Sequence, residues 1–150
     1  MAETSKEENE PSDLDETTHL ELSAMYRDAS VNILFAKLVQ WIVIGLSSIV
    51  FATAVTAVNL SPSGKTLANL FTIAIILLTC GAMFMLFMYQ MWQFNEIKRI
   101  RRIEKHFSTL CRRINNIESR GERNVERYTM LFAMAAAVAC GALVAIFAIR

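Results

Sequence analysis

The 150-residue sequence has few of the residues that build cross-linked or metal-bound frameworks. Its three cysteines, Cys80, Cys111 and Cys140, include no Cys-x-x-Cys pair, and an odd, scattered set argues against a disulfide framework. Its two histidines, His19 and His106, have no second ligand at metal-binding spacing. We therefore expect no metal site, and we interpret the cysteines as small packing residues.

The sequence also lacks the residue arrangements that carry catalysis. No nucleophile is placed beside a base, and no two acids are placed for acid–base chemistry. Residues 63–66 match the end of a phosphate-binding loop, but Asn59 stands where that loop needs its first glycine, and no strand precedes it. We therefore predict a protein that is not an enzyme and that has no cofactor and no small-molecule substrate.

Charged residues are missing from three long apolar stretches. Residues 38–58 carry no charge and are long enough to cross about 30 Å of hydrocarbon. Residues 67–92 form a second such stretch, and residues 129–150, closed by Arg150, form a third. The polar residues well inside the first two are hydroxyl residues: Ser47, Ser48, Thr53, Thr56, Thr72 and Thr79. The absence of ionisable residues at this depth argues against a pump or a proton-coupled transporter.

What is present predicts an all-α membrane protein with three transmembrane helices. Lys37 and Trp41 stand at the start of the first stretch, and Tyr89 and Trp92 stand at the end of the second. Aromatic rings and long basic side chains are typical of the boundary between the hydrocarbon and the headgroups.

The amino-terminal region is acidic. Residues 1–28 carry nine acids and two bases, a net charge of −7, and this start does not resemble a cleavable signal peptide. Residues 1–17 contain almost nothing apolar, which predicts a disordered tail. Residues 18–37 then show helical apolar spacing, with Thr18 as the expected N-cap and Glu21 completing a capping box. This amphipathic lead-in helix either lies on the membrane surface or continues into the first span.

A basic, amphipathic cytosolic segment, residues 93–128, separates the second and third spans. It carries ten bases and five acids, a net charge of +5. Its apolar residues recur at spacings of three and four: Ile100, Ile103, Phe107, Leu110, Ile114 and Ile117. In one arrangement this stripe dips into an anionic leaflet, and basic residues face the lipid headgroups: Lys98, Arg99, Arg101, Arg102, Lys105, Arg112 and Arg113. In another, the stripe packs on the lead-in helix or on a neighbouring subunit.

The distribution of basic residues predicts the orientation. With three spans, the amino terminus and residues 93–128 share one side of the membrane, which holds thirteen Lys and Arg residues, against two on the other side. The positive-inside rule then predicts a cytoplasmic amino terminus and an external carboxy terminus in the inner (plasma) membrane. Because the basic segment is tethered to the membrane at both ends and carries an apolar stripe, we expect lipid or protein partners and no nucleic acid.

Small residues form two candidate packing ridges. Residues of the third span follow a small-x-x-x-small pattern: Ala133, Ala137, Gly141 and Ala145. Gly45 and Ala52, with Thr56, form a looser version in the first span. Such ridges let helix backbones approach closely in lipid. They serve either to pack the three spans against one another or to join copies of the chain.

The region before the first span resembles a short signature of small bacterial inner-membrane proteins. The matching residues are Tyr26, Arg27, Asp28, Asn32, Ile33, Phe35, Lys37, Gln40 and Trp41. The order of two spans followed by a cytosolic helix is also similar in outline to SLATT-type membrane effectors of bacterial defence systems. The third span departs from that plan, so the resemblance carries no functional residue over.

We therefore expect an accessory, scaffolding or assembly subunit that forms a homo-oligomer or joins a larger membrane complex through helix–helix packing and its basic cytosolic segment. The alternative is an oligomeric pore or channel-like effector, lined by the Ser and Thr face of residues 38–58.

Overall fold

The structure, a computed structural model, describes residues 14–61, 64–109 and 120–150 of the chain. Within these residues it contains helices and no strand. The helices are α1 (Glu16–Leu60), α2 (Gly64–Glu104) and α4 (Arg120–Ile149). Each of the three includes a stretch long and apolar enough to cross a membrane. The expectation of an all-α chain with three such helices is confirmed.

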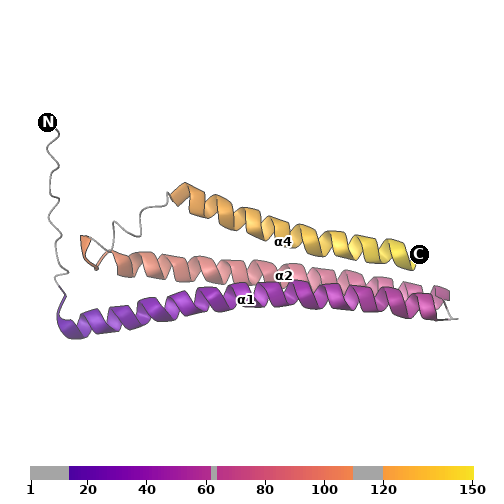
Figure 1. Ribbon diagram of the computed structural model, residues 1–150, viewed down its shortest axis with the longest axis horizontal. Coiled ribbons are helices and arrows are strands. Elements are labelled where there is room, and N and C mark those ends of the chain that lie inside the picture. Colours follow the sequence, from indigo (N-terminus) through magenta and orange to yellow (C-terminus); the bar gives the residue numbers. More distant parts are fainter. Residues whose placement is uncertain (1–13, 62–63, 110–119) are drawn as a thin grey trace.

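The three helices form an elongated bundle (Figure 1). α1 and α2 are antiparallel and lie side by side along most of their length, and α4 packs against both, with its amino-terminal end spread away from α2. The start of α1 and the end of α4 lie at opposite ends of the bundle. With 45 residues at about 1.5 Å each, α1 is about 68 Å long, more than twice the roughly 30 Å of a bilayer's hydrocarbon.

This length means that α1 and α2 extend beyond the predicted spans. The lead-in segment 18–37 continues without a break into the first span, which decides between the two arrangements left open for it. α2 likewise continues beyond Trp92 to Glu104, so residues 93–104 belong to the same helix as the second span. A hydrogen-bonded turn follows, in which the amide of His106 donates to the Ile103 carbonyl oxygen at 3.0 Å.

The amino-terminal end of α1 differs from its expected position by three residues. The N-cap is Asp15, whose carboxylate accepts a hydrogen bond from the Thr18 amide at 3.2 Å. Thr18 therefore lies in the first turn and is not the cap. Asp is as good an N-cap as Ser or Thr, and Glu16 adds a favourable negative charge at this end of the helix dipole.

The carboxy-terminal end of α1 is determined by a proline. Ser61 has extended backbone angles and closes the helix, and its amide donates to the Val58 carbonyl oxygen at 3.2 Å. The next residue is Pro62, and a residue that precedes proline is disfavoured in the helical conformation. Because α1 runs to Leu60 and α2 begins at Gly64, the connection between them is shorter than the gap of residues 59–66 between the two predicted spans.

The bundle has two parts, which we name by their side chains. The membrane half comprises residues 38–60 of α1, 64–92 of α2 and 129–149 of α4. Its core is built by side chains of all three helices at spacings of mostly three, four and seven residues: Phe51, Ala54, Val58, Ile75, Ala82, Leu86, Met134, Val138, Ala142, Ala145 and Ile149. This spacing brings one face of each helix to the common axis.

The polar half comprises residues 16–37 of α1 and 93–104 of α2, where charged residues return. Here α1 buries Ala29 and Ala36 completely, and α2 buries Ile97 and Ile103. The two alanines are seven residues apart and therefore face the same side of α1. Leu20 and Met25, nearer the start of α1, are exposed.

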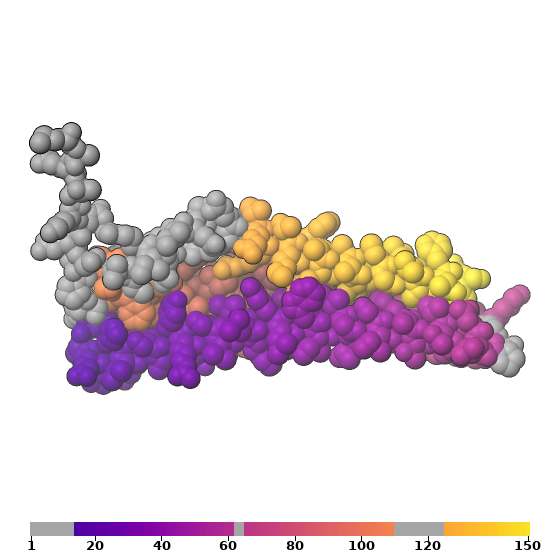
Figure 2. Space-filling model, in the orientation of Figure 1, coloured from indigo at the N-terminus to yellow at the C-terminus, as the bar shows by residue number. Residues whose placement is uncertain are grey.

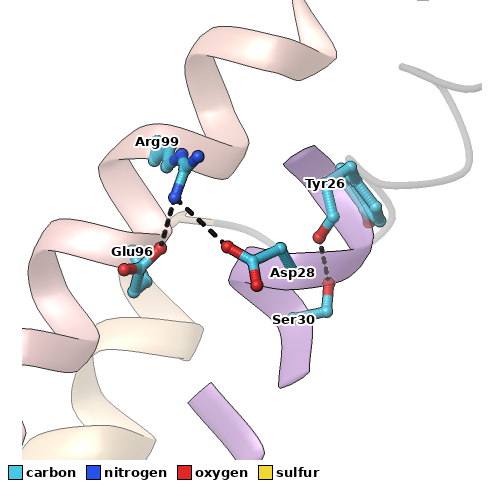
Figure 3. A network of polar contacts seen from close by, with 5 residues as sticks. All are labelled: Tyr26, Asp28, Ser30, Glu96 and Arg99. Atoms are coloured by element: carbon cyan, nitrogen blue, oxygen red, sulfur yellow. Dashed lines mark hydrogen bonds and ion pairs between the residues drawn. The ribbon is translucent and has the colours of Figure 1, made fainter. Parts of the chain in front are cut away.

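Polar contacts supplement this packing (Figure 3). The Arg99 guanidinium of α2 lies 3.5 Å from the carboxylate of Asp28 on α1 and 3.8 Å from that of Glu96, one turn earlier on its own helix. On α1, the Ser30 hydroxyl donates to the carbonyl oxygen of Tyr26 at 2.9 Å. The ion pair to Asp28 joins the two helices across the polar half.

Candidate functional site

Three buried glutamines lie where the membrane half meets the polar half. Gln40 belongs to α1, and Gln90 and Gln93 belong to neighbouring turns of one face of α2. All three are at least 93% buried. Three polar amides so close to the apolar spans require hydrogen-bond partners, because lipid offers none.

The glutamines bond to one another and to the backbone. The Gln40 amide nitrogen Nε2 donates to the Leu86 carbonyl oxygen at 3.2 Å and to Oε1 of Gln90 at 3.4 Å. In turn, Oε1 of Gln40 accepts a hydrogen bond from Nε2 of Gln93 at 2.9 Å. Gln40 thus uses both of its donors and its acceptor oxygen, and it clamps α1 to α2.

The backbone carbonyl of Leu86 determines how the glutamine amides are oriented. A carbonyl oxygen only accepts, so the Gln40 group facing it is the NH₂. Gln90 must then turn its oxygen towards Gln40, so the NH₂ group of Gln90 points away from Gln40. This Nε2 atom is buried and donates to no acceptor within the residues that the structure describes.

The glutamines line a pocket between the three helices. Its volume is about 140 Å³, enough for several water molecules or a small polar group. We call it the polar pocket, and it is lined by Lys37, Gln40, Gln90, Gln93, Glu126, Arg127, Met130, Leu131 and Met134. Two cations and one anion therefore border it. Lys37 and Glu126 are exposed, whereas Arg127 is half-buried.

Aromatic rings mark the level of the polar pocket on all three helices. Trp41 follows Gln40, Tyr89 precedes Gln90, Trp92 precedes Gln93, and Tyr128 follows Arg127. The rings of Tyr89 and Trp92 lie 5.9 Å apart. Phe94 on α2 contacts Tyr128 on α4, also with ring centroids 5.9 Å apart. Trp and Tyr are enriched at the membrane–water boundary, so these rings predict that the polar pocket is at headgroup level.

The basic residues predicted to contact lipid or protein lie along the end of α2 and beyond it. Lys98, Arg102 and Lys105 are exposed, and Arg101 is half-buried. Arg99 instead faces α1, where it pairs with an acid. Four of the predicted contacts are therefore at least partly accessible, and one takes part in joining α1 to α2.

The described part of the apolar stripe packs on protein. Ile103 is buried, and the Phe107 ring lies 5.6 Å from that of His19 and 6.0 Å from that of Tyr26, both on α1. Of the two arrangements considered, packing against the lead-in region is the one found here. Outside the described part of the chain lie the remaining stripe residues Leu110, Ile114 and Ile117, the basic residues Arg112 and Arg113, and Cys111.

The small ridge of the third span is divided between two environments. Ala145 is buried, and Gly141 packs on α1, where a Cβ atom would meet the Phe51 ring at 3.3 Å. Ala137 and Ala133, about one and two turns before Gly141, are exposed. The carboxy-terminal half of the ridge thus serves internal packing, and the other half faces outward.

The ridge of the first span faces outward completely. A Cβ atom added at Gly45 would meet no atom within 4 Å, and Ala52 is exposed. Ser48 and Thr56 lie on the same side of α1 and are also exposed. Their hydroxyls donate to backbone carbonyl oxygens four residues earlier, each at 2.9 Å. We call these four residues the outer ridge of α1.

The cysteines and acids form no cluster where the structure describes them. Cys80 and Cys140 are unpaired and exposed, so they do not fill the core as expected. No three His, Cys, Asp or Glu side chains come together to hold a metal within 14–61, 64–109 and 120–150. Hydrogen bonds from the hydroxyl and the backbone amide of Thr18 hold the pKa of Asp15 below its ordinary value.

Sequence reasoning missed the glutamines, because it searched the spans for ionisable and hydroxyl residues. A signal was present: Gln90 and Gln93 are three residues apart, next to the aromatic residues of the span end, and Gln40 holds the matching place in the first span. Only the antiparallel pairing of α1 with α2 shows that these positions meet.

Comparisons of the chain with models of protein families, with curated proteins and with solved structures find no match.

Proposed function

We propose that this protein is a non-catalytic membrane subunit that assembles with other transmembrane helices through the outer ridge of α1. The observation that carries the proposal is the ridge itself: Gly45, Ser48, Ala52 and Thr56 recur at spacings of three and four and are all exposed. Small side chains at this spacing let a second helix approach closely, which is how helices associate where no hydrophobic effect acts between them.

The inner and outer small residues of this chain support that interpretation. Gly141 lies where α4 crosses α1, and the space beside it is filled by Phe51. Gly45 leaves a similar space with no neighbour from its own chain. α1 runs the full length of the molecule, and one long side of it is uncovered in Figure 2. A further helix, from a second copy or from another membrane protein, fits that side.

The same proposal includes the orientation of the chain in an inner (plasma) membrane, with the polar half in the cytoplasm. The support is the charge distribution along the sequence: thirteen Lys and Arg residues precede the first span or lie between the second and third spans, and only Lys65 and Arg150 are elsewhere. The exposed Lys98, Arg102 and Lys105 would then face the anionic inner leaflet or a cytosolic partner.

A pore is the competing proposal, because the exposed Ser48, Thr53 and Thr56 could line a channel between several copies. The packing of one copy does not favour a channel through it. The polar pocket lies at one end of the membrane half. A hollow of about 480 Å³ beside Asn59, Lys65 and Arg150 lies at its other end, and the apolar core separates the two. A pore would therefore need an oligomer formed through α1.

The test compares Gly45→Leu and Ala52→Leu with Ala74→Leu, the same kind of enlargement at an exposed position of α2. The native mass of the complex, gently extracted from its own membrane, is measured with its co-purifying proteins. We expect the two ridge variants to lose an oligomer or a companion that wild type and Ala74→Leu retain. An unchanged mass in both ridge variants contradicts the proposal.

Conductance distinguishes the two functions once association is known. Purified oligomer in liposomes is expected to carry no current across voltage and lipid composition if the chain is an assembly subunit. A conductance that the ridge variants abolish would instead establish the pore.

A further inference from the structure

We propose that the polar pocket binds a phosphate group, supplied by a phospholipid headgroup or by the free ion. This binding site is separate from the outer ridge of α1 and does not depend on the proposed assembly function. It is built from α1, α2 and α4 together, so a bound phosphate would contact all three helices at once.

Gln90 carries a buried hydrogen-bond donor. Its Nε2 atom lacks an acceptor among the described residues, and Gln90 is 93% buried. A buried donor without an acceptor costs about 1–3 kcal/mol. The amide cannot rotate to avoid this cost, because its oxygen accepts from Gln40, whose own orientation is determined by the Leu86 carbonyl. Gln90 lines the polar pocket, so a group bound there can supply the acceptor.

The side chains around the polar pocket carry a net positive charge. Lys37 and Arg127 border the pocket, and the one acid, Glu126, is exposed to solvent. The lining thus carries a net charge of +1 beside a donor with no acceptor. An anionic group that only accepts hydrogen bonds fits this lining, and guanidinium and ammonium groups are strong partners for phosphate oxygens.

The polar pocket is at the level of the aromatic residues that flank the spans. Its glutamines and Arg127 are each adjacent in sequence to a Trp or Tyr, and these rings mark the boundary of the hydrocarbon. Phospholipid phosphates lie at that boundary. Met130, Leu131 and Met134 form the apolar side of the lining, towards the membrane half, where acyl chains would continue from a bound headgroup.

The sharpest variant is Gln90→Glu, which keeps an oxygen for Gln40 and replaces the NH₂ that has no acceptor with an oxygen that repels phosphate. The matched control is Lys98→Gln, which removes one exposed positive charge from the same end of α2 without touching the pocket. Gln90→Leu removes the donor without adding charge, so it shows whether repulsion alone explains a loss.

The full-length protein, purified in neutral detergent, is titrated with phosphatidylglycerol in one arm and with inorganic phosphate in the other. Native mass spectrometry counts the bound lipid, and the thermal unfolding midpoint reports stabilisation in both arms. We expect Gln90→Glu and Gln90→Leu to weaken binding by roughly tenfold or more, and Lys98→Gln to leave it nearly unchanged.

The two arms separate the sources of the phosphate. Retention of phosphatidylglycerol with no effect of inorganic phosphate assigns the site to a lipid headgroup, and stabilisation by inorganic phosphate assigns it to the free ion. Wild-type protein that binds neither, or Gln90 variants that bind as wild type does while still folded by circular dichroism, would overturn the proposal and leave a pocket filled by water. Native mass without added lipid, measured in parallel, reports on the assembly function independently.

Discussion

The two halves of the bundle pack the same two helices in different solvents. In the polar half, α1 and α2 carry charged residues, and buried side chains such as Ile103 are shielded from water. In the membrane half, side chains such as Ile75 are shielded from lipid, which is as apolar as they are. Association in the polar half can therefore use the hydrophobic effect, whereas association in the membrane half depends on close fit and on a few hydrogen bonds.

The difference explains what each half contains. The membrane half places Gly141 against Phe51 with no room to spare, and its boundary is closed by the glutamine clamp. In the polar half, α1 and α2 are joined by an ion pair, by ring contacts and by the packing of two buried alanines. The partners of the ion pair are partly exposed to water.

The largest effect is expected when one isoleucine is truncated in each half. Ile103→Ala should destabilise the packing of α1 on α2 by about 3 kcal/mol, because it loses both transfer from water and cavity contacts. Ile75→Ala, equally buried, should cost roughly half as much, because only the cavity contribution remains in lipid. The free energy of unfolding in bicelles measures both, and equal losses would contradict the two-solvent explanation.

The next effect is expected where the fit is tightest. Gly141→Leu should destabilise the bundle by about 2 kcal/mol, because the new side chain must displace the Phe51 ring. Gly45→Leu is the control, since it adds the same side chain at an open position and should leave the stability of a single copy unchanged or slightly higher. Similar losses in both variants would show that fit at the α1–α4 crossing is unimportant.

A smaller effect is expected at the glutamine clamp. Gln40→Leu removes three hydrogen bonds at the junction and should cost about 1 kcal/mol, the usual size for hydrogen bonds between membrane helices. A double-mutant cycle with Gln93→Leu measures the shared part, since the two side chains bond directly at 2.9 Å. Additive losses would mean that this bond contributes nothing.

The ion pair of the polar half should contribute less again. Asp28→Asn is expected to cost about 0.5 kcal/mol or less at low salt, because both partners are more than a third exposed. At about 1 M salt, where charges are screened beyond roughly 3 Å, the loss should vanish. Unfolding of the polar half, followed by hydrogen exchange of α1 amides, provides the measurement, and a salt-independent loss would point to packing of Asp28 instead.

The smallest effect is expected at the amino-terminal end of α1. Because the folded pKa of Asp15 is lowered, its carboxylate stabilises the first turn above the ordinary pKa of an aspartate, and this contribution is lost as the pH falls through the folded pKa. Exchange of the Thr18 amide should therefore be less protected below about pH 4. Asp15→Asn retains an acceptor oxygen and should remove this pH dependence.

The fold could be predicted to a large extent from the sequence, and the candidate site to a smaller one. Three uncharged stretches of about twenty residues have few alternatives to membrane-spanning helices. The extents of the helices were harder, because nothing in residues 93–104 marks a break or its absence, and propensity at a helix end is a weak guide. Gly45 and Gly141 belong to similar patterns, yet one is open and one is packed.

By itself, the sequence determined that this chain is helical and that three of its stretches are long and apolar enough to cross a membrane. It also determined that most of the basic residues precede the first span or lie between the second and third spans. These properties follow from composition along the chain, which is local. The tertiary structure alone decided that Gln40 meets Gln90 and Gln93, that Phe107 contacts α1, and which face of α1 is left uncovered. Each of these depends on the rotation of one helix against another, which is set by the fit of side chains from distant parts of the chain.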